Sequence, residues 1–76
     1  MKTVQISLNS IDKVKSFVNA ITQFNFDFDL ISGRYVIDAK SIMGIFSLDL
    51  SKPIDLAIHT EDDLDKVMDV LKPYLV

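Results

Sequence analysis

The chain has 76 residues, eleven acidic and eight basic, and its net charge of −3 at pH 7 disfavours nucleic-acid binding as its main role. It has no cysteine and one histidine, so a disulfide framework and a conventional zinc site are excluded, and we expect no metal or cofactor. No apolar run is long enough to span a membrane, and the sequence starts as an alternating strand rather than as a signal peptide, so we expect one cytoplasmic, monomeric domain over residues 1–76.

The first half of the chain predicts a strand, a helix and a second strand. Apolar and polar residues alternate over residues 3–8, which is typical of a half-buried strand. Asn9 or Ser10 then caps a helix. The apolar positions of this helix follow helical spacing: Ile11, Val14, Phe17, Val18 and Ile21. A second alternating run over residues 24–30 predicts a strand with one wet, acidic face.

The second half predicts two more strands, each followed by a helix. Gly33 can take the positive φ that a tight hairpin requires, and a strand over residues 34–39 follows it. Ser41 caps a short helix that ends near Asp49, before a break at Pro53. The fourth strand covers residues 54–59. The last helix has Thr60 as its cap and ends at Pro73. Its first turn holds the acidic residues Glu61, Asp62 and Asp63. Its core stripe is Leu64, Val67, Met68 and Leu71.

The resulting order β-α-β-β-α-β-α predicts an α+β sandwich. Four mostly antiparallel strands carry three helices on one face, and the other face is largely wet. The short helix after Ser41 is too apolar to bury all its side chains, so part of it should form an exposed patch that suits docking to a partner. Gly44 inside this helix indicates close packing or close approach by another chain, because glycine costs roughly 1 kcal/mol against alanine there.

Two segments carry a family resemblance. Residues 26–29, Phe-Asp-Phe-Asp, and residues 39–48, Ala-Lys-Ser-Ile-Met-Gly-Ile-Phe-Ser-Leu, resemble HPr, the histidine-containing phosphocarrier of the bacterial sugar phosphotransferase system. The order and length of the elements agree over essentially the whole chain. The resemblance implies an open-faced β-sandwich with three helices.

The phosphorylation segment of that family is not retained. HPr accepts phosphate from Enzyme I on a histidine at the start of its first helix, where this chain has Asp12, with Val14 in place of an arginine. The single imidazole, His59, matches no phosphorylation position. The resemblance therefore implies a divergent member without phosphoryl transfer on nitrogen, and no enzyme activity.

The docking segment, in contrast, is retained. Ser41 matches the serine that a dedicated kinase phosphorylates in HPr of Gram-positive bacteria. Ile42, Met43 and Phe46 match the patch that docks onto Enzyme I, the HPr kinase and the catabolite-control repressor. We include Lys40, Lys13 and Lys15 among the partner-docking residues.

Each of these residues also has a purely structural reading. Ser41 is an N-cap whether or not it is phosphorylated, and Ile42, Met43 and Phe46 could be core or a homodimer seam. Asp12 complements the helix dipole in its first turn, or accepts phosphate, or imitates a phosphorylated state. Lys13 and Lys15 are either solvated or bind an anion. His59 is a surface residue of its strand.

Three functions follow. The first is a non-catalytic, HPr-like regulatory protein that docks through the Ser41 helix and is phosphorylated there. The second is a working phosphocarrier with a non-histidine acceptor such as Asp12. The third is a ferredoxin-like module that senses a ligand or dimerises.

Overall fold

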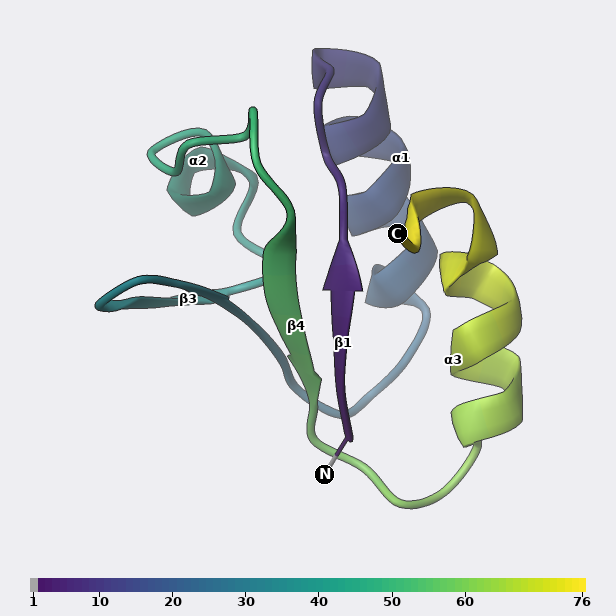
Figure 1. Cartoon of the computed structure of the whole chain (residues 1–76). Coiled ribbons are helices and arrows are strands. Elements are labelled where there is room, and N and C mark those ends of the chain that lie inside the picture. Colours follow the sequence, from purple (N-terminus) through teal and green to yellow (C-terminus); the bar gives the residue numbers. More distant parts are fainter. Residues whose placement is uncertain (1) are drawn as a thin grey trace.

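The fold is a four-stranded sheet with its helices packed on one side (Figure 1). The computed structural model describes residues 2–76, so the predicted first strand, residues 3–8, lies within the described residues. The strands are β1 (Lys2–Ile6), β2 (Phe28–Ser32), β3 (Tyr35–Asp38) and β4 (Ile54–Ile58). The helices are α1 (Ile11–Thr22), α2 (Ile42–Ile45), α3 (Leu64–Leu71) and the 3-10 turn η1 (Lys72–Tyr74).

The strand order is β1-β4-β2-β3, and every neighbouring pair is antiparallel. The register aligns Val4, Leu56, Leu30 and Ile37 across the four strands, and Leu56 and Leu30 are fully buried. Because side chains alternate along a strand, the next row of paired residues lies on the opposite face. That row is Gln5, Asp55, Ile31 and Val36. One face is therefore apolar and covered, as predicted, and the other is mixed and open.

The helices bury their apolar stripes on the covered face. Val14, Phe17 and Ile21 of α1 are buried, as are Val67 and Leu71 of α3. Figure 1 shows α1 and α3 lying together on one side of β1 and β4. The α+β open-faced architecture with the order β-α-β-β-α-β-α is therefore confirmed.

The prediction of a strand over residues 24–30 was wrong in its first half. β2 begins only at Phe28, and Phe24 and Phe26 precede it in a bent segment. The rings of Phe24 and Phe26 stack with their centroids 5.3 Å apart, and Phe28 lies 5.2 Å from Phe26. Alternating phenylalanines thus form an aromatic cluster instead of one face of a strand.

The predicted end of α2 and the predicted start of α3 also need correction. α2 ends at Ile45 rather than near Asp49, and the chain continues in turns in which the Leu48 amide donates to the Ile45 carbonyl at 3.0 Å. α3 begins at Leu64 rather than directly after Thr60. The Thr60 hydroxyl accepts from the Asp62 amide at 3.0 Å, so this threonine forms a local turn instead of a helix cap.

Tyr74 closes the core in a way that the sequence analysis did not predict. Its ring lies edge-on to Phe17 with centroids 5.6 Å apart, and its hydroxyl hydrogen-bonds to Ser16 of α1. The chain then passes along β1, where the Val76 amide donates to the Gln5 carbonyl and Leu75 forms a bridge with Ile6. The C-terminal segment therefore covers part of the β1 edge.

Gly44 explains how α2 lies so close to β3. A Cβ on this residue would lie 2.7 Å from Ile37 Cγ2 and 3.2 Å from Ser41 Oγ. The close packing predicted for Gly44 is confirmed, and the neighbour is this chain's own strand.

We expect Gly44→Ala to lower the free energy of unfolding by about 1–3 kcal/mol, because the added methyl overpacks against Ile37. Urea unfolding of G44A, I37A and the double variant measures this. In the Ile37→Ala background the same change should cost less, since Cγ2 is gone. An equal cost in both backgrounds would contradict the proposed clash.

Candidate functional site

The start of α2 is built as the sequence predicts. Ser41 has an extended backbone, and its exposed Oγ accepts a hydrogen bond from the Gly44 amide at 3.3 Å. Such a cap satisfies an amide that has no partner within the helix. Ser41 thus stands at the surface with its hydroxyl aimed at the first turn of α2.

The apolar residues of α2 and its C-cap differ in exposure. Ile45 is buried, and Ile42 is half-buried against the core. Met43 is 78% exposed and Phe46 is 41% exposed. Ile42 and Phe46 are four residues apart and therefore share one side of the helix, next to the side on which Ile45 is buried. The expected exposed patch is therefore present, although Ile42 contributes less to it than its two neighbours.

The start of α1 lies toward the same end of the molecule as α2 (Figure 1). Ser10 is its N-cap and accepts from the Lys13 amide at 3.1 Å, which settles the choice between Asn9 and Ser10. Asp12 is exposed in the first turn, where a carboxylate complements the helix dipole. Lys13 is half-buried and Lys15 is exposed.

The helical period separates these charged side chains. The bond between Ser16 and Tyr74 marks the side of α1 that faces the C-terminal segment, and Lys13, three residues from Ser16, lies toward that side. Ile11 and Lys15, four residues apart, share another, exposed side of α1, and α1 is in contact with α2. The helical period therefore separates Lys15 from Lys13, and the exposed Asp12 lies between them around the first turns of α1.

Ile11 lies at the surface, although the sequence analysis grouped it with the apolar positions of this helix. It is 61% exposed, because the first residue of α1 precedes the part of the helix that meets the sheet. We call the surface formed by Ile11, Lys15, Ser41, Met43 and Phe46 the α1–α2 face. The exposure of Ile11 could have been expected from its position directly after the capping serine, Ser10.

Lys40 makes contacts within the chain. Its Nζ donates to the Phe24 carbonyl at 2.8 Å and to the Phe26 carbonyl at 3.0 Å, and it lies 5.8 Å from the centroid of the Phe28 ring. The ammonium thus binds two carbonyls of the bent segment before β2. Its geometry serves the fold, and we do not place it on the α1–α2 face.

His59 lies on the open face, directly after β4. Its Nε2 is 2.7 Å from Asp29 Oδ2, and its amide donates to the Asp27 carbonyl. Asp29 stands opposite Asp38 in the sheet register, so His59 provides a hydrogen-bond partner for a carboxylate that faces another carboxylate. It remains a surface residue, as predicted.

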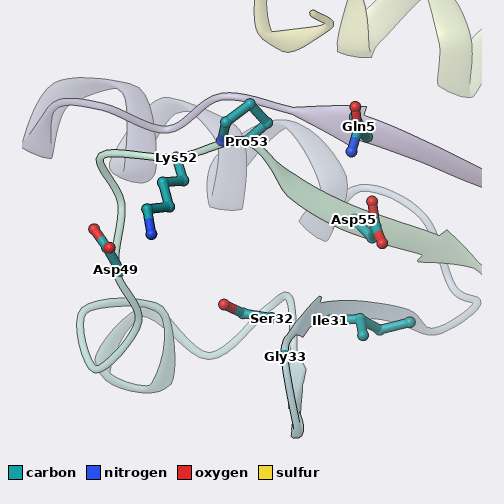
Figure 2. A pocket seen from close by; sticks show the side chains of 8 residues that line it. All are labelled: Gln5, Ile31, Ser32, Gly33, Asp49, Lys52, Pro53 and Asp55. Carbon is teal, nitrogen blue, oxygen red and sulfur yellow. The ribbon is translucent and has the colours of Figure 1, made fainter.

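A shallow hollow of about 380 Å³ opens between the β2–β3 hairpin and the start of β4 (Figure 2). Its lining is mostly polar and comprises Gln5, Ile31, Ser32, Gly33, Asp49, Lys52, Pro53 and Asp55. None of the site residues predicted from the sequence belongs to it. Over residues 2–76, moreover, no three His, Cys, Asp or Glu side chains are placed to hold a metal ion. No helix in that range is both long and apolar enough to cross a membrane.

Comparison with solved structures assigns the fold. A crystal structure titled HPr-C-His, from Thermoanaerobacter tengcongensis, matches with a TM-score of 0.77 over 95% of this chain and 89% of that chain, at 24% sequence identity. The chain has the HPr fold. This match favours the open-faced β-sandwich over the ferredoxin-like alternative. Neither a protein-family model nor a curated protein matches the sequence.

We expect Lys40→Met to lower the free energy of unfolding of this HPr-like domain by about 1–3 kcal/mol, because two hydrogen bonds from a charged donor are lost while the apolar stem is kept. Lys15→Met is the matched control, and it should change stability by no more than about 0.5 kcal/mol. Urea unfolding measures both. Equal effects of the two variants would show that the Lys40 contacts contribute nothing.

Asp49, just after α2, should titrate abnormally. The Ser51 hydroxyl and amide both donate to its Oδ1, and these bonds lower the pKa of Asp49. The stabilisation by Asp49 is present above its pKa in the unfolded chain and is lost as pH falls through its lower pKa in the folded chain. Ser51→Ala should therefore raise the pKa of Asp49 and reduce this acid loss. Carboxyl carbon shifts followed by NMR against pH measure the change, with Ser47→Ala as the control; an unchanged pKa in S51A would contradict the assignment.

Proposed function

We propose that the chain is a non-catalytic, HPr-like cytoplasmic protein that binds other proteins through the α1–α2 face. The observation that carries this proposal is the exposure of Met43 and Phe46 beside Ser41, the N-cap of α2. Both large apolar side chains stand on a helix that Gly44 and Ile45 fix firmly to the sheet. A rigid apolar patch with polar neighbours is typical of a protein-binding site.

The same geometry argues against relay through the histidine. α1 follows β1, whose last residue Ile6 pairs with Ile54 at the start of β4, whereas His59 follows Ile58 at the other end of β4. The imidazole is thus at the opposite end of the sheet from the start of α1. Asp12 occupies the position that the resemblance assigns to the phosphorylated histidine, and it acts in this proposal as a first-turn carboxylate.

Phosphorylation of Ser41 would control docking. Its exposed hydroxyl lies at the start of α2, where helix amides favour negative charge, next to Met43. A phosphate there would add charge and bulk at the edge of the apolar patch. Enzyme I, an HPr kinase and a transcriptional regulator are the partners that the HPr resemblance suggests for this site.

Phosphorylation assays with intact-mass readout test this function. We expect a gain of one phosphate with ATP and an HPr kinase, no gain with phosphoenolpyruvate and Enzyme I, and loss of the kinase product in Ser41→Asn. Asparagine retains the capping acceptor, so S41N keeps the fold while removing the phosphorylated oxygen. A gain with Enzyme I would instead identify a working carrier, and Asp12→Asn would show whether Asp12 accepts the phosphate.

Docking is tested separately by binding to the same HPr kinase in a titration calorimeter. We expect Met43→Lys and Phe46→Lys each to weaken binding at least about tenfold, because a charge replaces an apolar contact at the centre of the patch. Val76→Lys is the matched control, since Val76 is 69% exposed and lies outside the α1–α2 face. Equal loss in all three variants, or no loss in the first two, would contradict the assigned surface.

A further inference from the structure

β3 is an edge strand whose outer side is free within residues 2–76. It pairs only with β2, and its Tyr35 and Val36 are 68% and 65% exposed. The Ala39 amide donates to the Phe28 carbonyl, toward β2. Because hydrogen-bonding direction alternates along an antiparallel strand, Ile37 and Tyr35 also face β2, and the amide and carbonyl of Val36 face outward.

The two edges of the sheet are protected differently. The β1 edge is partly covered by the C-terminal segment, through the bridge between Ile6 and Leu75 and the bond from Val76 to Gln5. β3 has no such cover and contains no proline or lysine, the residues that commonly prevent an edge strand from pairing. Its outer side is therefore available for another strand.

Two charges of opposite sign flank this edge. Arg34, at the hairpin tip, has no hydrogen-bond or ion-pair partner in the described part of the chain. Asp38, at the other end of β3, accepts from the Lys40 amide and has no cationic partner among residues 2–76. They share one face of the strand but are four residues apart, about 13 Å, which is too far for an ion pair within one copy.

We propose that a second copy of this chain pairs antiparallel with β3 through this edge. With Val36 opposite Val36 of the second copy, the outward-facing amides and carbonyls meet. Arg34 of each copy then lies opposite Asp38 of the other copy, which gives two charge pairs. Tyr35 then stands beside Ile37 of the second copy, an aromatic and β-branched pair. A register shifted by two residues keeps the backbone hydrogen bonds but loses both charge pairs. The charges therefore favour the register with Val36 opposite Val36.

The pairing extends the sheet without covering the α1–α2 face. Antiparallel strands place the α2 helices of the two copies at opposite ends of the new strand pair, because α2 follows the Asp38 end of β3. β3 has only four residues, so the contact is small and the association weak. The inference is independent of the proposed function.

Sedimentation equilibrium from about 10 μM to about 1 mM tests the proposal. The average mass should rise with concentration from 8.6 kDa toward twice that value. Arg34→Glu should raise the dissociation constant at least about tenfold, because it creates two like-charge contacts. The double variant Arg34→Glu with Asp38→Arg exchanges the two charges and should return the dissociation constant to within about threefold of the wild-type value. Lys66→Glu, an equal charge change at an exposed position of α3, should alter it by no more than about twofold.

Circular dichroism of each variant establishes that it is folded before the masses are compared. A mass that stays at 8.6 kDa throughout would overturn the proposal. So would a dimer unaffected by Arg34→Glu, or a folded double variant that stays as weak as the single one. Loss of the dimer in Met43→Lys but not in Arg34→Glu would place the contact on the α1–α2 face and also overturn it.

Discussion

The close approach of Gly44 to Ile37 is the contact on which the arrangement of the functional surface depends. No residue with a Cβ fits at this position without movement of Ile37 or Ser41. The contact packs α2 against β3. With α2 in this position, Met43 and Phe46 are exposed to solvent and Ile45 is buried. A four-residue helix has little stability of its own, so its position must come from packing. The exposed patch is thus a consequence of how tightly the opposite side is held.

A second set of contacts fixes the approach to that helix. Lys40 binds the carbonyls of Phe24 and Phe26, so the segment before β2 and the segment before α2 are tied together. A lysine ammonium that is half-buried needs such acceptors, since burial without them is costly. The residue just before Ser41 therefore stabilises the fold, and the proposed docking role is assigned to residues after it.

Local signals in the sequence predicted most of the fold, and they failed where contacts distant in sequence decide. The caps at Ser10 and Ser41 and the glycine in α2 follow from short-range rules. Phe24 and Phe26 looked like one face of a strand because alternation alone cannot show that Lys40 takes the carbonyls that a strand would use. Thr60 looked like a cap because its competing turn with Asp62 uses the same hydroxyl. Ile11 has the spacing of the apolar stripe, and its exposure was indicated only by its position as the first residue of α1, directly after the capping Ser10.

β3 connects the two surfaces that we propose. On its covered face Ile37 holds α2 through Gly44, and along its free edge Val36 offers backbone groups to a second copy. The two contacts use different sides of the same strand, so α2 and a second copy do not compete for β3. In the proposed function the start of α1 carries Asp12 where the resemblance places a histidine, so the role assigned to the chain rests on binding through a fixed α2 and not on phosphoryl transfer.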